Sequence, residues 1–105
     1  MRRVVTVFLI ALVSAVSGCK GSGDGALGAE LFSLHCASCH PNGGNTINPS
    51  KTLRPDDLRA NNIRTPGDIV EKMRNPGAGM PRFTPAVIPD RDALRIAEHV
   101  LAGFR

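Results

Sequence analysis

The chain has 105 residues, enough for one small domain at most. Its formal net charge is +4, and loss of Arg2 and Arg3 from the N-terminus would leave 11 Lys and Arg residues against nine Asp and Glu residues. This mild positive charge, without a basic run or interleaved aromatic residues, argues against nucleic-acid binding. Three cysteines are too few for a disulfide framework or a four-thiolate zinc site.

Residues 1–18 have the pattern of a secretory signal peptide. Arg2 and Arg3 form a basic start, and a mostly apolar run from Val4 to Val16 follows. A membrane-spanning helix needs about 20 apolar residues, so this shorter run suits the hydrophobic region of a signal. A buried N-terminal helix is the alternative, but the Gly- and Ser-rich stretch that follows favours the signal.

The end of this signal, Val16-Ser17-Gly18-Cys19, resembles the bacterial lipoprotein signal. The resemblance implies that cleavage leaves Cys19 as a lipidated N-terminus, anchored to a membrane by two or more acyl chains. An ordinary cleavage site, which would leave Cys19 as a stray thiol, is the alternative. Residues 19–25 are then expected to form a flexible tether, and residues 26–105 the folded domain.

The first helix of the domain is predicted to begin at Gly25 or Ala26, with Asp24 available as a cap. Two rows of residues recur at helical spacing. They are Leu27, Leu31 and Leu34, and Gly28, Phe32 and Cys36. A glycine inside a helix costs up to ~1 kcal/mol relative to alanine, so Gly28 suggests a packing requirement, with a merely tolerated glycine as the alternative.

Cys36-Ala37-Ser38-Cys39-His40 is the C-x-x-C-H pattern of c-type haem attachment. Thiols three residues apart on a helical turn point the same way and can add to the two vinyl groups on one haem edge. His40 follows Cys36 by four residues, so a ring nitrogen can reach the iron from the same face. A thioredoxin-like pair would follow a strand, and zinc would need further ligands, so both are disfavoured.

Short helices and turns are predicted for the middle of the chain. A turn-rich loop at 41–45 follows the motif, and Pro55 with the acids after it begins a short helix. The T-x-x-D pattern that starts at Thr65 is a weaker relative of the capping box, and it opens a helix that runs to about Arg74.

Met80 lies in a proline-rich stretch. The prolines around Met80 are Pro76, Pro81, Pro85 and Pro89. They restrict the backbone, which suits a thioether that must be held against a metal. A last helix is predicted from Asp90 to Phe104, and two apolar rows are expected along it. They are Leu94, Ala97 and Leu101, and Ile96, Val100 and Gly103.

Gly28-x-x-x-Phe32, followed four residues later by the Cys36-Cys39-His40 motif, resembles class I cytochrome c. The resemblance covers residues 26–104. It implies an all-α fold of orthogonal helices wrapped around one covalently bound haem c. It also implies that the glycine lets the first helix cross closely over the last.

The segment from Thr65 to Phe83 resembles the small photosynthetic cytochromes c of cyanobacteria and algae. These place the second iron ligand at the position of Met80. Met73 is the rival ligand, but its place on an apolar helical face favours a role in the core. A core of about 80 residues is marginal, so the chain without haem is expected to be poorly folded.

His99 departs from the family, which usually has an aromatic residue there. Packing of the imidazole at the helix crossing, with one nitrogen bonded to backbone or water, is favoured over a pH switch or an alternative iron ligand. His35 is expected to be solvated. The haem propionates would be bound by Lys51, Arg54 or the backbone of residues 42–46, while Arg82 is expected to be a surface charge.

With His40 and Met80 both bound, the iron has no open position, which predicts an electron carrier and not an enzyme. The carrier is expected on the periplasmic side of a bacterial membrane, attached through Cys19, with donor and acceptor proteins as partners and no nucleic acid. A haem sensor or small peroxidase is the rival, in which Gly77 and Gly79 loosen the loop and Met80 dissociates. A structural module of a respiratory complex is a third reading.

Overall fold

The computed structural model describes residues 22–104, which form four α-helices and one 3-10 turn. The helices are α1 (Ser22–His35), α2 (Pro55–Ala60), α3 (Pro66–Arg74) and α4 (Asp90–Ala102), and the 3-10 turn η1 is Pro41–Gly43. No strand occurs among these residues, as the all-α prediction requires. None of the helices described is both long and apolar enough to cross a membrane. The predicted signal peptide and Cys19 lie outside the described residues.

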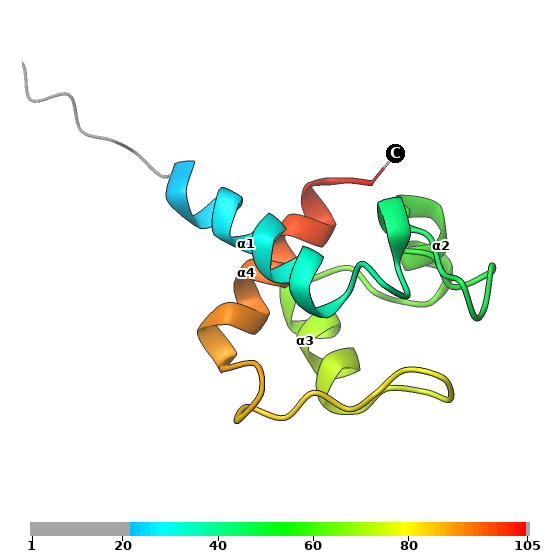
Figure 1. Cartoon of the computed structure of the whole chain (residues 1–105). Coiled ribbons are helices and arrows are strands. Elements are labelled where there is room, and N and C mark those ends of the chain that lie inside the picture. Colours follow the sequence, from blue (N-terminus) through cyan, green and yellow to red (C-terminus); the bar gives the residue numbers. More distant parts are fainter. Residues whose placement is uncertain (1–21, 105) are drawn as a thin grey trace, which may run out of the picture.

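α1 and α4 cross in contact with each other, and α3 packs against α4 (Figure 1). Gly28 lies at the α1–α4 crossing. A Cβ atom there would be 2.5 Å from the carbonyl oxygen of Arg95 and 3.2 Å from the Cβ of His99. Only glycine allows this approach, so the packing requirement predicted for Gly28 is confirmed.

α1 begins earlier than the sequence predicts. Residues 22–25, the end of the predicted tether, belong to its first turns. Asp24 gives a physical reason, because its carboxylate accepts a 3.2 Å hydrogen bond from Nε of Arg95 on α4 and so ties this end of α1 to the domain.

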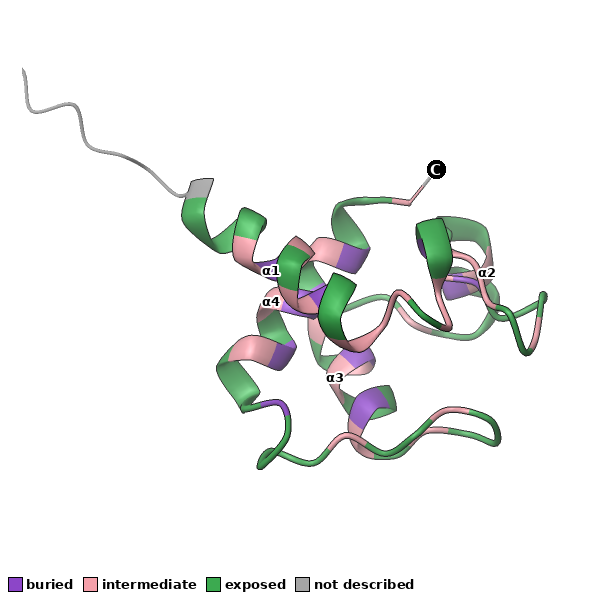
Figure 2. Ribbon diagram, in the orientation of Figure 1, coloured by how far each residue is buried: buried purple, intermediate pink, exposed green. Residues whose placement is uncertain are grey.

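The core gathers where α1, α3 and α4 meet, as the buried residues in Figure 2 show. Its apolar members are Phe32, Leu58, Ile69, Met73, Ile88, Ala93, Ile96, Ala97 and Val100. The row containing Gly28 and Phe32 is therefore the buried face of α1. Leu34, predicted to lie in an apolar stripe, is 75% exposed, because the crossing with α4 covers only one face of the helix. Leu94 and Leu101 on α4 are also exposed, so that predicted row is wrong for both leucines, although Ala97 between them is fully buried.

Local sequence signals account for the start of α3. The Thr65 hydroxyl accepts a 3.2 Å hydrogen bond from the backbone N–H of Asp68. The Asp68 carboxylate accepts one of 2.9 Å from the Thr65 N–H in return. The capping pattern is thus a complete capping box, and the predicted end at Arg74 is also confirmed.

Candidate functional site

A cavity of about 280 Å³ lies beside the α1–α4 crossing and is lined mainly by apolar side chains. Its walls come from the end of α1 and the cysteine motif, residues 45–53, α2 and the turn after it, α3, residues 76–83, and α4. Phe32 and Ile96, from the two crossing helices, are part of this lining. The helix crossing therefore forms one wall of the candidate site.

The cysteine motif forms part of the cavity wall. α1 ends at His35, and the chain continues in helical turns, with hydrogen bonds of 2.8 Å from the Cys36 N–H to the Phe32 carbonyl and 2.9 Å from the His40 N–H to the Cys36 carbonyl. Cys36 and Cys39 are free, half-buried thiols. Burial raises the pKa of the Cys36 thiol to about 11, with a smaller contribution from Cys39.

The His40 ring is held by one hydrogen bond. Its Nδ1 lies 2.8 Å from the carbonyl oxygen of Gly44 and donates to it. This bond selects the tautomer in which Nε2 carries the lone pair, the form that a metal-binding imidazole needs. Asn42 and Gly43 have positive φ values of 53° and 76°, and they turn the chain so that the Gly44 carbonyl faces back towards the ring.

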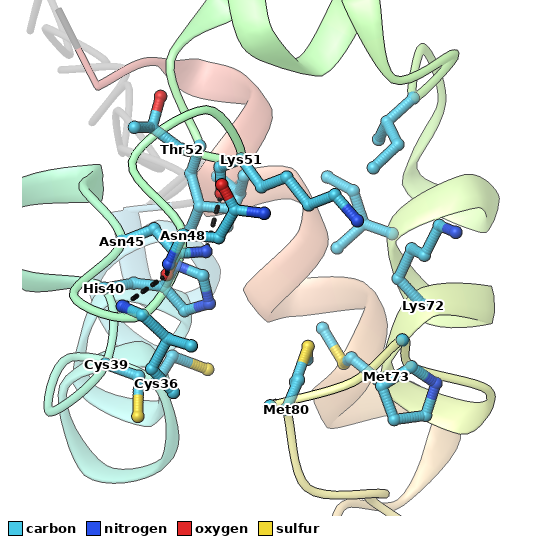
Figure 3. Close-up of a pocket in the computed structure, with 18 of the residues that line it drawn as sticks. Cys36, Cys39, His40, Asn45, Asn48, Lys51, Thr52, Lys72, Met73 and Met80 are labelled. Atoms are coloured by element: carbon cyan, nitrogen blue, oxygen red, sulfur yellow. Dashed lines mark hydrogen bonds between the residues drawn. The ribbon is translucent and has the colours of Figure 1, made fainter.

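Met80 and Met73 both line the cavity, and Figure 3 shows them across from Cys36, Cys39 and His40. Met73 is almost fully buried in the core, in line with the core role predicted for it. Met80 is half-buried on the loop between α3 and α4, so its thioether is the more accessible of the two.

The turn before Met80 is left-handed at Gly79. Gly79 has a φ of +92°, a region that disfavours other residues, and a Cβ there would lie 3.0 Å from Cγ2 of Ile47. This close approach to the 45–53 loop argues against the loosening role predicted for Gly79, whereas a Cβ at Gly77 would meet nothing within 4 Å.

Arg74 is a residue whose role sequence reasoning missed. Its guanidinium donates hydrogen bonds of 3.0 Å to the carbonyls of Phe83 and Ile88, and one of 2.7 Å to the Asp90 carboxylate. Nothing in the sequence points to this role, because an arginine in the last turn of a helix is already explained by its favourable interaction with the helix dipole. Arg82, predicted as a surface charge, donates from Nε to the Arg74 carbonyl at 2.8 Å.

Polar side chains form one part of the cavity lining. Lys51, a predicted propionate partner, lines the cavity, whereas Arg54, the other predicted side chain, is not among the lining residues. Asn45 organises this loop: its Nδ2 donates to the Lys51 carbonyl at 2.8 Å, and its Oδ1 accepts from the backbone N–H of Ile47 (Figure 3). Lys72 on α3 also lines the cavity and was missed, because a lysine near a helix end usually faces solvent.

The other two histidines take part in aromatic contacts. The His99 ring lies 5.4 Å from the ring centroids of both Phe32 and Phe104. It is absent from the cavity lining, which agrees with packing at the crossing and speaks against an alternative iron ligand. His35 lines the cavity and meets Phe83 edge-on at 6.3 Å, so the prediction that it is solvated is wrong.

The lining suits a large apolar ring with a metal at its centre. Two thiols can attach the ring through its vinyl groups, and an imidazole with a free Nε2 and a thioether are the axial donors of a His/Met haem. The apolar majority of the lining matches the ring, and Lys51 and Lys72 supply positive charge for acidic substituents.

Known proteins are similar to this chain in sequence and in fold. The family model of the cbb3-type cytochrome c oxidase subunit III matches residues 23–100. Cytochrome c6 of Cyanidioschyzon merolae is 37% identical over 99 residues, 94% of this chain and 86% of that protein.

Two solved structures show the same fold. The outer membrane cytochrome OmcF of Geobacter sulfurreducens aligns with a TM-score of 0.72 and 55% identity, over 74% of this chain and 99% of that one. Cytochrome c6 of the diatom Phaeodactylum tricornutum aligns with a TM-score of 0.66 and 33% identity, over 76% and 93%. The chain therefore belongs to the class I c-type cytochromes, electron carriers with one covalently bound haem c, and is similar to the photosynthetic cytochromes c.

Proposed function

We propose that Cys36 and Cys39 hold the haem, that His40 Nε2 and Met80 Sδ are its axial ligands, and that the chain carries single electrons between redox partner proteins. The observation that carries this proposal is one cavity lined by the cysteine motif on one side and by Met80 on the other (Figure 3).

The hydrogen bond of the His40 ring supports its role as an iron ligand. The bond from His40 Nδ1 to the Gly44 carbonyl fixes the ring and leaves Nε2 as the ligand. Haem supplies a one-electron iron couple, and a His/Met pair raises its reduction potential relative to two nitrogen ligands. With both positions filled by protein, no site remains for oxygen or peroxide, which is the state that a carrier needs.

Lys51 and Lys72 are proposed to bind the haem propionates. Both line the cavity and carry positive charge, whereas Arg54 lies outside the lining. The side-chain amide of Asn45 holds the backbone of Lys51, so the loop that presents this lysine is ordered by the chain itself.

The chain is proposed to work on the exported side of a bacterial membrane, anchored through lipid on Cys19. The basic start, the short apolar run and the Ser17-Gly18-Cys19 sequence support this location. One structural relative is itself named an outer membrane cytochrome. Intact mass of the membrane-extracted protein tests the anchor: lipid and haem masses on the chain from Cys19 support it, and a chain with an unmodified Cys19 overturns it.

Met80→Ala tests the ligand assignment. Ferric wild-type protein is expected to show the long-wavelength absorption band of methionine–iron ligation and to resist cyanide at neutral pH. Met80→Ala should lose the band and bind cyanide rapidly. Met73→Leu is the matched control, because it removes the other thioether in the cavity and should keep both properties. Loss of the band in Met73→Leu but not in Met80→Ala would overturn the assignment.

The rival, a sensor or small peroxidase in which Met80 dissociates, has less support. The bonds of Arg74 hold the Met80 loop at two points, and the turn at Gly79 leaves little room for a side chain beside Ile47. Rapid binding of cyanide or carbon monoxide by the wild-type protein would favour the sensor. Stable copurification with oxidase subunits would favour a module of a respiratory complex.

A further inference from the structure

The loop from residue 75 to residue 89 connects α3 to α4 and carries Met80; it runs along the edge of the molecule (Figure 1). It contains no helix or strand, and most of its residues are exposed. A segment of this kind opens more readily than the packed helices. Something other than secondary structure must therefore hold Met80 towards the cavity.

We propose that Arg74 is the positioning residue for Met80, acting through three hydrogen bonds that fasten the 75–89 loop at two points. The proposal rests on the ligand role proposed for Met80.

The first point is the base of the Met80 turn. The Phe83 N–H donates to the Met73 carbonyl at 2.9 Å, and the guanidinium of Arg74 donates to the Phe83 carbonyl at 3.0 Å. Nε of Arg82 closes the same turn with its 2.8 Å bond to the Arg74 carbonyl. The two ends of the segment 74–83, which includes Met80, are thus joined to each other by hydrogen bonds.

The second point is the return of the loop to α4. Nη2 of Arg74 donates to the Ile88 carbonyl at 3.0 Å and to the Asp90 carboxylate at 2.7 Å. Ile88 is almost completely buried, so this part of the loop is anchored in the core. One guanidinium therefore joins the end of α3, the base of the Met80 turn and the start of α4.

The chemistry of the side chain explains why this residue is an arginine. A guanidinium offers five N–H donors in a rigid plane, so it can serve several acceptors at once, whereas a lysine ammonium is a point charge on a flexible stem. The side chain of Arg74 is only 15% exposed, which limits competition from water. Hydrogen bonds made by a charged donor are also stronger than neutral ones.

Arg74→Gln tests the inference through the iron and not through stability alone. Cyanide can reach the iron only after Met80 leaves, so its rate of binding reports how often the loop opens. Arg74→Gln is expected to bind cyanide about tenfold faster or more, because opening no longer breaks the charged bonds. The methionine–iron band should also be lost at lower pH than in the wild type. Arg74→Lys should show a smaller acceleration than Arg74→Gln.

Arg95→Gln is the matched control. Arg95 is also a largely buried arginine, with 22% of its side chain exposed, and it pairs with Asp24 and Asp92 away from the loop. Its loss should lower the melting temperature while cyanide binding stays within about twofold of the wild type, a change equivalent to ~0.4 kcal/mol.

The outcomes separate this inference from the ligand assignment. If wild-type protein shows the methionine–iron band and Arg74→Gln and Arg74→Lys bind cyanide at the wild-type rate, the positioning role is wrong and the ligand role stands. Equal acceleration in Arg74→Gln and Arg95→Gln also overturns it, since the effect is then general destabilisation. If the wild type lacks the band and binds cyanide as fast as Met80→Ala, both proposals fail. Where Arg74→Gln does not accumulate with haem, Arg74→Lys decides alone.

Discussion

Gly28→Ala should weaken the crossing of α1 and α4 on which one wall of the cavity depends. The new Cβ would lie 2.5 Å from the Arg95 carbonyl oxygen and 3.2 Å from its carbon. Both are backbone atoms in the middle of α4, so no side-chain rotation can relieve the clash. Ordinary contact begins near 3.4 Å, so the helices must separate by up to about 1 Å.

The size of the effect follows from two opposing terms. Overpacking of this kind costs roughly 1–3 kcal/mol, and replacing glycine by alanine inside a helix returns up to ~1 kcal/mol. The free energy of unfolding should fall by about 1–2 kcal/mol. For a domain of this size, 1 kcal/mol corresponds to roughly 4–8 °C, so the melting temperature should fall by about 5–15 °C.

Thermal unfolding of the haem-bound protein, followed by circular dichroism, measures this change. Gly25→Ala is the matched control, because Gly25 lies in the same helix and a Cβ there would meet nothing within 4 Å. It should leave the melting temperature unchanged or raise it slightly. If the melting temperature of Gly28→Ala equals that of Gly25→Ala and is no lower than that of the wild type, the inferred close crossing is wrong.

Three further predictions concern the loop, the cap and the cofactor. Gly43→Ala should destabilise the protein by at least about 2 kcal/mol, as measured by chemical denaturation, because the new Cβ would clash with the Phe104 ring and the φ of +76° is unfavourable for alanine. Hydrogen bonds from the Arg64 and Thr65 backbone lower the pKa of Asp68 in the folded protein. The stabilisation from this cap is therefore present above pH ~4 and is lost as the pH falls through the folded pKa. Asp68→Asn should remove that part of the pH dependence of the free energy of unfolding. Removal of haem should abolish cooperative melting, since the apolar cavity then has nothing to fill it, and a haem-free chain with a native-like near-ultraviolet signal would contradict this.

Local signals in the sequence predicted those parts of the fold that neighbouring residues determine. The capping pattern at Thr65 predicted the start of α3, and Pro55 predicted that of α2. Gly28 predicted a packing requirement, because an interior glycine has a cost that packing can explain. The resemblance to class I cytochrome c implied that this packing is the crossing with the last helix. The cysteine motif and Met80 were predicted to share a site, and they line one cavity.

The features that were missed depend on contacts between distant segments. Periodicity marks a face of a helix as apolar but does not say which face its partner covers, so Leu34 and Leu94 were assigned to buried rows although they are exposed. The bonds of Arg74 reach 9 to 16 residues along the chain and leave no local pattern. Lys72 was missed because a lysine near a helix end usually faces solvent, whereas here it also lines the cavity.

Phe104 shares with His99 the place beside Phe32. The family's usual aromatic residue at that position suggests a ring packed on Phe32, and in this chain Phe104 packs there as well, with its centroid 5.0 Å away. The Phe104 ring also lies where a side chain at Gly43 would be, next to the residue whose carbonyl holds His40.

The segment just after the C-terminal end of α4 is thereby linked to the orientation of His40, one of the proposed iron ligands. Phe32 at the crossing contacts Phe104, Phe104 fills the space beside Gly43, and the turn at Gly43 directs the Gly44 carbonyl to Nδ1 of His40. On the other side, Arg74 joins the start of α4 to the Met80 loop. The two proposed iron ligands are therefore held from opposite ends of the same helix, so a change in the tilt of α4 would affect both.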